Sequence, residues 1–385
     1  MLFSDVIGQD QIKVQLQRAV EEQRVSHAQL FLGPSGSGNL AMALAFAQYL
    51  NCENKQHGDS CGTCPGCTKA QKWIHPDIHF TFPVFKVDKK ETCADWMPEW
   101  RNFISETPYG DYEDWVRMNE IDKSKQGNIT AHECQEILRI LTLKNFEAPY
   151  KILILWLPEF LEKEGNRLLK IIEEPPDNTV FLFVANDQER IINTILSRMQ
   201  MVKFPRLSEA EISSTLVEKH GLNSEQSKKL AAMSEGDFQA ALHFLNTQED
   251  GNTLLLQEWI HACRHSNVKA LFAWNDKWIR LGREYQKSFL HYAMHFYRQM
   301  LLQSAGLDVS DKLTPAEIRT AREVEGALSP DAIAHITGLL DKSIYFVERN
   351  ANARILITYI SVSIMQQFRG QYKQNNKPFF LEWEA

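Results

Sequence analysis

The feature that most constrains the fold is a short apolar segment that leads through a glycine-rich loop into a helix-forming segment. Residues 28–32 are mostly apolar, residues 33–38 read GPSGSG, and residues 40–47 are rich in alanine and leucine. Glycines let the backbone N–H groups of such a loop wrap around a phosphate, and the helix that follows adds its positive amino-terminal dipole. The pattern predicts a strand, a phosphate-type loop and a helix, in that order.

Two further apolar runs extend this architecture. Residues 152–157 read ILILWL, and residues 180–185 read VFLFVA. Continuous rather than alternating hydrophobicity is typical of parallel strands that helices cover on both faces. Because the runs alternate with helix-like segments, we predict an α/β domain with a parallel sheet of the P-loop type over residues 1–206.

The remainder of the chain has helical patterns. Ser208, with Glu211 three residues later, resembles a capped helix start, and helical segments continue to a polar stretch at residues 246–252 that we interpret as a linker. Beyond it, two sets of apolar residues recur at helical spacing and predict core stripes: Leu271, Trp274, Trp278, Leu281 and Tyr285, then Ile333, Ile336, Leu340, Ile344 and Val347. We predict a small helical domain over residues 207–248 and an all-α domain over residues 249–385.

The composition is that of a soluble globular protein. Hydrophobic residues make up 44% of the chain and charged residues 24%, and no apolar run approaches the roughly 20 residues of a membrane-spanning helix. The net charge of −7 argues against a general phosphate-backbone binder. The amino-terminal MLFSDVIGQDQ lacks the pattern of a secretion signal. We expect a cytoplasmic protein without membrane contact, whose partners are mainly other proteins.

The glycine loop lacks the two residues that handle ATP. Gly33, Gly36 and Gly38 are in place, but the full pattern continues with a lysine for the β/γ-phosphates and a serine or threonine for magnesium. Asn39 and Leu40 stand there instead, and they offer neither a positive charge nor an oxygen ligand for the metal. We therefore expect the three glycines and Asn39 to form a degenerate phosphate loop that binds no ATP. A glycine turn that merely joins strand to helix is the alternative.

A cluster of cysteines follows the predicted helix. Cys52, Cys61, Cys64 and Cys67 have the spacing C-x8-C-x2-C-x2-C. Four thiolates can enclose a tetrahedral zinc ion, and such a closed site has no open position for a substrate. We predict a structural zinc module over residues 50–70, with a group of free thiols as the alternative. The other cysteines are isolated and are expected to be packed thiols: Cys93, Cys134 and Cys263.

Four blocks of sequence point to a known family. They are residues 6–9 (VIGQ), 26–34 (SHAQLFLGP), 166–176 (NRLLKIIEEPP) and 194–199 (TILSRM). In order and approximate spacing, these blocks resemble the AAA+ subunits of bacterial DNA polymerase III clamp loaders, and the likeness extends over residues 5–207. The resemblance implies that residues 207–248 form the family's lid and that residues 249–385 form its oligomerising collar. It also places the cysteine cluster where this family carries a zinc module.

The chain departs from the ATP-hydrolysing members beyond the phosphate loop as well. Trp156 and Leu157 stand where an active subunit carries an acidic pair for magnesium and water, and Gln239 replaces the arginine of the lid segment. Glu159 is displaced from the acidic position, and we interpret it as a solvated loop residue. The resemblance therefore implies a delta-prime-type subunit, for which we expect no intrinsic ATPase activity.

The block at residues 194–199 is similar to the family's T-I-x-S-R-C, with Met199 in place of the cysteine. In clamp loaders the arginine of this motif reaches into the ATP site of the neighbouring subunit. The resemblance thus implies a catalytic role in trans for Arg198, an arginine finger that follows Ser197, because a guanidinium offsets charge on the transferring phosphoryl group. A solvated surface arginine is the alternative.

The family resemblance also implies partners. These are the other clamp-loader subunits (gamma/tau and delta), with the sliding clamp and primer–template DNA met through the complex, and a structural zinc ion as the cofactor. An ATP-hydrolysing motor subunit of the gamma/tau type is the alternative function. A zinc-stabilised adaptor that has left replication is a third, which co-purification with loader subunits would distinguish.

Residues 84–128 form an insertion that is longer than usual for this family. It contains many acidic residues and a group of large aromatic ones: Trp96, Trp100, Tyr109, Tyr112 and Trp115. Aromatic residues can stack on single-stranded nucleic acid, but the neighbouring carboxylates would repel phosphate. We therefore favour a packed elaboration or a protein contact over a nucleic-acid site.

Overall fold

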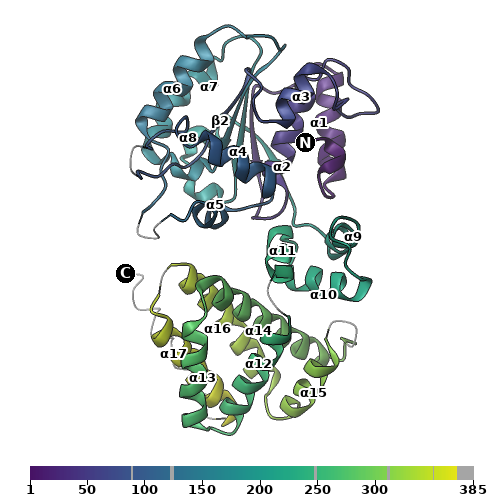
Figure 1. The fold of residues 1–385 in the computed structure, drawn as a ribbon, viewed down its shortest axis with the longest axis vertical. Helices are drawn as coiled ribbons and strands as arrows, with labels where there is room; N and C mark the ends of the chain where they lie inside the picture. The colour runs from purple at the N-terminus through teal and green to yellow at the C-terminus, as the bar shows by residue number, and fades with distance from the viewer. Residues whose placement is uncertain (88–89, 122–124, 247–248, 310–312, 350, 371–385) are drawn as a thin grey trace. The chain divides into compact units, whose positions relative to one another are not determined.

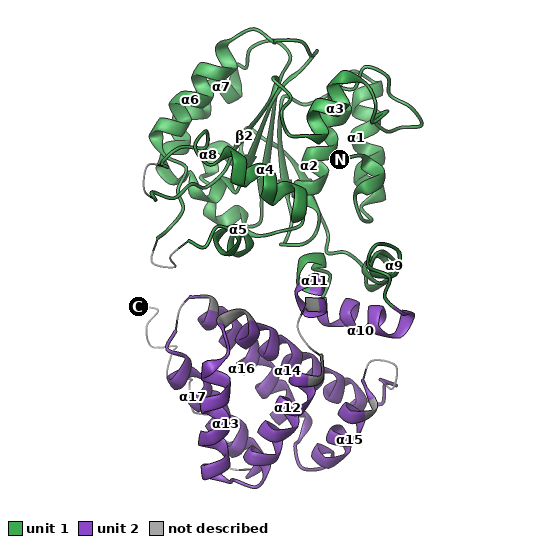
Figure 2. Ribbon diagram, in the orientation of Figure 1, with its two compact units in different colours: residues 1–222, 234–240 green, residues 223–233, 241–385 purple. Residues whose placement is uncertain are grey.

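The computed structural model describes residues 1–87, 90–121, 125–246, 249–309, 313–349 and 351–370. The chain divides into two compact units, here called the first unit (residues 1–222 with 234–240) and the second unit (residues 223–233 with 241–385), as Figure 2 shows. The predicted lid, residues 207–248, is divided between them, and its limits as a domain stay a prediction. The predicted collar beyond residue 370 lies outside the described residues.

The first unit is built on a five-stranded parallel sheet with the strand order β2-β3-β4-β1-β5 (Figure 1). Every residue of β3 and β4 is buried, because helices cover both faces of the sheet. This confirms the predicted parallel α/β architecture. The strands are β1 (Ala28–Leu32), β2 (Ile78–Thr81), β3 (Lys151–Trp156), β4 (Thr179–Ala185) and β5 (Gln200–Lys203).

Helices α1, α2 and α3 lie on one side of this sheet, and α6, α7 and α8 lie on the other (Figure 1). Helix α9 begins with the predicted capping box, in which Ser208 and Glu211 each accept a hydrogen bond from the other's backbone N–H. The helices are α1 (Asp10–Glu21), α2 (Asn39–Leu50), α3 (Pro65–Gln71), α4 (Met97–Glu106), α5 (Tyr112–Met118), α6 (Ala131–Thr142), α7 (Leu169–Glu173), α8 (Asn193–Leu196) and α9 (Glu209–His220). Short 3-10 turns are η1 (Phe3–Asp5), η2 (Pro158–Phe160), η3 (Glu162–Leu168) and η4 (Gln188–Arg190).

The insertion packs aromatic side chains against the end of β3. The ring of Trp100, on α4, stacks 4.3 Å from that of Phe82 and lies 5.1 Å from that of Trp156, the last residue of β3. Most of the aromatic residues singled out in the sequence are buried, and Tyr112 is half-buried, which confirms the packed interpretation. The buried ones are Trp96, Trp100, Tyr109 and Trp115.

The described part of the second unit is helical. Its elements are α10 (Ser224–Ser234), α11 (Phe238–Asn246), α12 (Glu249–Arg264), α13 (Val268–Arg280), α14 (Arg283–Ser304), α15 (Pro315–Val324), α16 (Pro330–Glu348) and α17 (Ala353–Phe368), of which α10 and α11 also contribute residues to the first unit. The stripe along α16 is buried as predicted, at Ile333, Ile336, Leu340, Ile344 and Val347.

Two predictions for the second unit are wrong in part. The first apolar stripe ends with α13, because Gly282 caps the start of a new helix, and Tyr285 on α14 is 50% exposed. The stretch at residues 246–252 is not a continuous linker, since α11 ends at Asn246 and α12 begins at Glu249. Acidic residues are favoured in the first turn of a helix, so the polar sequence extended the predicted linker into the start of α12.

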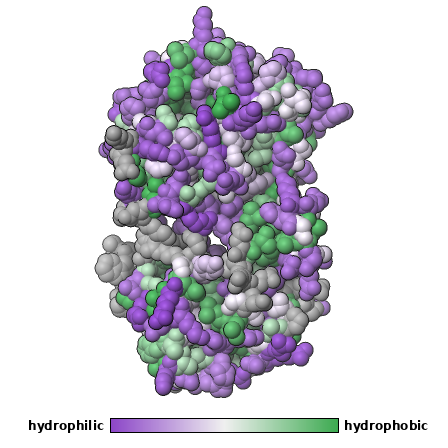
Figure 3. All heavy atoms as spheres, viewed as in Figure 1, coloured by the Kyte–Doolittle hydropathy of each residue, from purple (hydrophilic) through white to green (hydrophobic). Residues whose placement is uncertain are grey.

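The surface is mixed in polarity. On the face in Figure 3, hydrophobic residues form patches among hydrophilic ones. Single exposed apolar residues such as Phe146 and Ile355 are ordinary on protein surfaces. Among the residues that the structure describes, no helix combines the length and apolar character needed to span a bilayer.

The buried position of Trp100 leads to a stability prediction. We expect Trp100→Ala to lower the free energy of unfolding of the first unit by about 3–5 kcal/mol, because it leaves a large cavity between α4 and β3. The half-exposed Trp73 is the matched control, and Trp73→Ala should cost clearly less. Urea unfolding, with hydrogen exchange of the β3 amides as the readout, measures the free energy of unfolding of both variants. Equal losses of this free energy in the two variants would contradict the central role of Trp100.

Candidate functional site

The glycine-rich loop lies between β1 and α2, at the carboxyl edge of the sheet, where parallel α/β folds bind ligands. Gly36 and Gly38 have φ angles of 72° and 89°. Glycine adopts such positive φ angles readily, whereas a residue with a side chain would be strained there. Gly38 is the residue immediately before α2. The loop therefore has the position and the backbone shape of a phosphate-binding loop.

Asn39, at the lysine position, turns into the protein. Its Nδ2 donates to the carbonyl oxygens of Gly33 (3.3 Å) and Ala185 (3.0 Å) and to Oδ1 of Asn186 (3.3 Å). The residue is only 6% exposed. The Nδ2 group of Asn39 therefore bonds the loop to the end of β4. It points into the protein and not toward a ligand that would bind at the edge of the sheet.

Glu159 is buried, so its interpretation as a solvated loop residue is wrong. It is 4% exposed, and its Oε1 accepts hydrogen bonds from the backbone N–H groups of Asn186 (2.7 Å) and Asp187 (2.8 Å). Burial raises the pKa of the Glu159 carboxyl, although these N–H donors act in the opposite sense. Buried N–H groups after β4 need an acceptor, and Glu159 supplies one. It thereby braces the segment that holds Asn39.

Side chains from two other parts of the first unit contact the glycine loop. A Cβ added at Gly36 would lie 1.9 Å from Oδ1 of Asp237, and one added at Gly38 would lie 3.0 Å from Cε1 of Tyr109. The N–H of Phe238 donates to the carbonyl of Gly36 at 3.3 Å. The insertion and residues 234–240 thus both pack on the loop.

The positions of the expected acidic pair are apolar and buried. Trp156 and Leu157 are both buried, and the ring of Trp156 lies 5.3 Å from that of Phe103 in the insertion. Gln239, at the position of the lid arginine, is buried on α11. An indole and an aliphatic side chain offer no oxygen ligand for magnesium.

Arg198 follows α8 on the surface of the first unit, with 32% of its side chain exposed. Its guanidinium forms an ion pair with Glu173, and its Nη1 donates to the carbonyl of Thr194 (2.8 Å) and to Oγ of the exposed Ser197 (3.3 Å). A surface ion pair of this kind contributes about 0–1 kcal/mol. A more highly charged anion could therefore displace Glu173 from the guanidinium at little cost.

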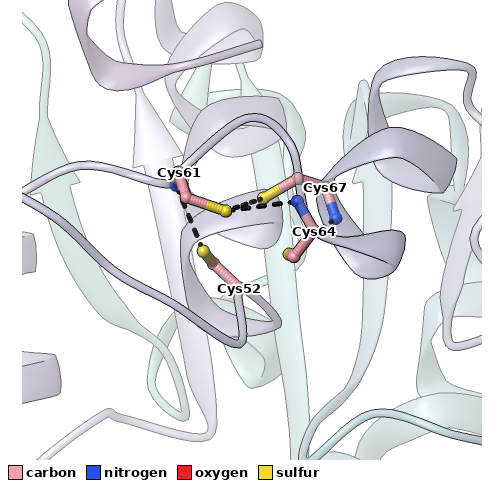
Figure 4. Close-up of side chains that lie close together, drawn as sticks. All are labelled: Cys52, Cys61, Cys64 and Cys67. Carbon is pink, nitrogen blue, oxygen red and sulfur yellow. Dashed lines mark hydrogen bonds between the residues drawn. The ribbon is translucent and has the colours of Figure 1, made fainter.

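Cys52, Cys61, Cys64 and Cys67 converge on one point (Figure 4). Their sulfur atoms all lie within 4.8 Å of one another, and Sγ of Cys61 is 3.9 Å from Sγ of Cys67. Tetrahedral zinc with Zn–S bonds of about 2.3 Å requires sulfur atoms roughly 3.8 Å apart. The four donors therefore fit a zinc ion in both chemistry and spacing.

Backbone N–H groups orient these sulfur atoms. Cys61 N donates to Cys52 Sγ (3.2 Å), Cys64 N to Cys61 Sγ (3.3 Å) and Cys67 N to Cys64 Sγ (3.4 Å). Hydrogen bonds from the N–H groups of Thr63 and Cys64 lower the pKa of the Cys61 thiol to about 6, whereas burial raises the pKa of the Cys67 thiol. A zinc ion ionises the thiols that bind it, whatever their pKa without metal.

A family model described as DNA polymerase III, delta subunit, matches residues 8–208, which is more than half of the 385 residues. The chain belongs to this clamp-loader AAA+ family. Within the family region lie the glycine loop, the cysteine cluster, the insertion and Arg198.

Curated relatives from this family's complex are similar to the chain at low identity. The tau subunit of DNA polymerase III from Bacillus subtilis is 23% identical over 388 residues, which cover 94% of this chain and 61% of that protein. The delta' subunit from the same organism is 24% identical over 303 residues, or 77% and 78% of the two chains. The gamma/tau subunit of Mycobacterium tuberculosis is 27% identical over 207 residues, or 52% and 28%. The chain thus spans less than two thirds of these tau and gamma/tau relatives.

Solved structures were also matched. The DNA clamp loader delta protein of Bacillus subtilis has 11% identity and a TM-score of 0.33, with coverage of 92% of this chain and 99% of that one. A gamma subunit-related protein of DNA polymerase III from Thermotoga maritima has 12% identity and a TM-score of 0.38, with coverage of 93% and 99%.

The structure brings the predicted site residues of this clamp-loader chain into separate places. The glycines and Asn39 form the loop, the four cysteines form their cluster, and Arg198 with Ser197 lies on the segment before β5. The sequence analysis gave no role to Glu173, which lies within the family block at residues 166–176, or to Asp237, which lies within the predicted lid. The sequence analysis named Tyr109 but gave it no role, because the contact of its ring with Gly38 depends on how the insertion folds.

The cysteine cluster gives a metal prediction. We expect the purified chain to contain about one zinc ion, and Cys67→Ser to lose it, because a closed four-thiolate site does not tolerate the loss of a ligand. Cys93→Ser is the matched control, since Cys93 is an equally buried thiol outside the cluster. Elemental analysis and thermal unfolding with and without a chelator measure the effect. Equal zinc content in both variants would contradict this assignment.

Proposed function

We propose that this chain is a non-hydrolysing, delta-prime-type subunit of a DNA polymerase III clamp loader. It helps to load a sliding clamp on primed DNA, and it completes the ATP site of a neighbouring subunit instead of operating one of its own. The observation that carries the proposal is the side chain of Asn39, which is bonded inward to β4 where an active site would present a lysine to the phosphates. In this proposal the complex combines ATP-hydrolysing motor subunits with a non-hydrolysing subunit, and this chain has the features of the non-hydrolysing one.

The charge around the loop supports the same proposal. Oδ1 of Asp237 lies against Gly36 and also accepts the N–H of Ala240 at 2.9 Å. A carboxylate there places negative charge beside backbone that would otherwise attract the negative charge of a phosphate. With Trp156 and Leu157 in place of carboxylates, magnesium also lacks its ligands. Binding of Mg–ATP would therefore be opposed by charge and unsupported by coordination.

Arg198 is the residue through which this subunit would act in catalysis. Its guanidinium is partly exposed, so it can enter the ATP site of an adjacent subunit once Glu173 is displaced. There it would offset the charge that develops on the γ-phosphoryl group, an effect worth about 10³–10⁵ in rate for arginine fingers in general. In this proposal Ser197 does not contact the phosphate. Its Oγ accepts a hydrogen bond from Nη1 of Arg198 and so helps to position the guanidinium.

The partners we propose are gamma/tau-type and delta subunits, with the clamp and primer–template DNA reached through the assembled complex. Residues 249–385 would form the collar. Val268 and Phe272 support this role, because they lie one helical turn apart on α13 and are both exposed. An apolar helix face of this kind is suited to packing against a helix of another subunit.

We also propose that the four cysteines hold a structural zinc ion. The cluster extends from just after α2 to the first turn of α3, and Cys64 caps the start of α3 by accepting the N–H of Cys67. The ion would replace a hydrophobic core for this short, glycine-rich segment. It takes no part in the chemistry of ATP, since all four of its positions are filled by protein.

The second candidate is an ATP-hydrolysing motor subunit. The similarity to tau and gamma/tau subunits, at 23% and 27% identity, favours it about as much as the 24% identity to delta' favours the first. The decision therefore rests on the site itself, where the lysine, the magnesium ligand and the acidic pair are replaced.

These replacements predict the nucleotide behaviour of the isolated chain. Titration calorimetry with millimolar Mg–ATP should give no binding heat, and the chain should show no ATP turnover, because the loop offers no lysine and no magnesium ligand. The control is a gamma/tau-type motor subunit under the same conditions. Turnover by the isolated chain at a motor-like rate would refute the proposed function.

The proposed role of Arg198 is tested in the reconstituted complex. We expect Arg198→Ala to leave assembly unchanged and to lower the DNA- and clamp-stimulated ATPase severalfold, because one ATP site loses its compensating charge. Arg167→Ala is the matched control, since Arg167 is also a partly exposed arginine that pairs with a nearby glutamate. Equal ATPase rates for wild type and Arg198→Ala would eliminate the finger.

A further inference from the structure

The proposed function gives no role to the insertion, yet one of its residues reaches the glycine loop. Tyr109 follows α4 and is 7% exposed. Its ring packs against Gly38, immediately before α2, and its hydroxyl accepts the backbone N–H of Ile7 at 2.8 Å. Its ring also meets that of Phe238 edge to face, with centroids 5.1 Å apart and an angle of 68° between the planes. A single side chain therefore joins three segments that are distant in the sequence.

Each of these contacts uses a different property of tyrosine. The flat ring lies close to Gly38 because that residue has no side chain, and the edge-to-face contact with Phe238 is a favoured aromatic geometry. The hydroxyl accepts the buried N–H of Ile7, which would otherwise lack an acceptor and destabilise the fold. Burial raises the pKa of the Tyr109 hydroxyl, so it stays neutral and can accept this bond throughout the physiological range.

We propose that Tyr109 is an intramolecular ligand of the nucleotide-type site, which fastens the glycine loop and residues 234–240 to each other in place of a bound nucleotide. This inference rests on the proposed function, because it requires that the loop holds no ATP. The ring packs against Gly38, the residue immediately before α2, and the amino terminus of a helix is where a phosphate would be bound. A side chain of the protein itself thus takes the place of a ligand at this site.

The insertion is anchored so that it can hold Tyr109 there. Trp100 on α4 packs on Trp156, and the N–H of Gly110 donates to the carbonyl of Thr107 at 2.8 Å, which forms a tight turn around Tyr109. Trp156, at the first position of the expected acidic pair, is thus one of the residues on which the insertion packs, together with Phe82. The apolar side chain at the acidic position and the internal ligand Tyr109 thus belong to one packing arrangement.

The second segment that Tyr109 holds is the start of α11. Phe238 N donates to Gly36 O at 3.3 Å, and Leu207 N donates to Gly236 O at 3.2 Å, so residues 234–240 bond to both the loop and the segment after β5. The contact with Tyr109 adds a side-chain connection to these backbone bonds. Residues 234–240 should therefore keep one position whether or not ATP is present.

The chain offers a matched pair of variants for the test. The hydroxyls of Tyr109 and Tyr112 both belong to the insertion and both accept a backbone N–H, from Ile7 at 2.8 Å and from Gly127 at 2.7 Å. Tyr109→Phe and Tyr112→Phe each remove one such oxygen and keep the ring. We expect hydrogen exchange in residues 5–9 and 234–240 of the full chain to rise on the order of tenfold in Tyr109→Phe, and more in Tyr109→Ala, but to stay unchanged in Tyr112→Phe.

Exchange of the wild-type chain with and without millimolar Mg–ATP is measured alongside, and we expect no difference. Equal exchange of the two phenylalanine variants in residues 5–9 and 234–240 would overturn the ligand role of Tyr109, whatever the nucleotide result. Protection of residues 33–40 by Mg–ATP would instead overturn the proposed nucleotide-free site. The two failures are therefore distinguishable, and the conservative Tyr109→Phe variant keeps the test decisive even if Tyr109→Ala does not fold.

Discussion

Burial of Trp156 at the end of β3 is the interaction on which the rest of the first unit depends. The carboxyl edge of a parallel sheet is where this type of fold binds its ligands, and here the edge is closed by the rings of Trp100, Phe103 and Trp156. Each such ring removes about 150–250 Å² from water, which at about 25 cal/mol per Å² corresponds to several kcal/mol. A magnesium-binding carboxylate at this position would lose its hydration within the same apolar cluster. Apolar packing and metal chemistry are therefore alternatives at this edge.

The polar groups around the closed edge satisfy one another. Glu159 accepts the N–H groups after β4, Asn186 accepts a bond from Asn39, and Asn39 donates to the loop carbonyl of Gly33. This chain of bonds holds the glycine loop in a phosphate-binding shape without a phosphate. Asn39 therefore does more than leave the expected lysine position uncharged, since its side chain also bonds the loop to the end of β4.

Much of this arrangement could be predicted from the sequence. Strands β1, β3 and β4 were evident because continuous apolar runs of strand length are typical of a buried parallel sheet, and the cysteine cluster was evident because ligand spacing is local. Strands β2 and β5 were not among the predicted segments, and most residues of β5 are exposed. Glu159 was misjudged because a charged residue after a buried strand normally faces water, whereas here it turns back to accept two N–H groups. Tyr109 and Glu173 could not be paired with Gly38 and Arg198, since those contacts depend on how distant segments pack.

A subunit with a closed site has a physical advantage as the partner of a motor. The proposed catalysis in trans would require that the guanidinium of Arg198 be delivered at a fixed distance from a neighbour's phosphate, because errors of about 1 Å can cost on the order of 100-fold in rate. An AAA+ core that opened and closed around its own ATP would move Arg198 with each cycle. In this chain the contact between Trp100 and Trp156, the Asn39 bonds and the Tyr109 bond all connect separate segments of the core, and such contacts would oppose this motion. If the proposed function holds, a loop that binds no ATP would therefore favour precise placement of Arg198, because both lie on the core of the first unit.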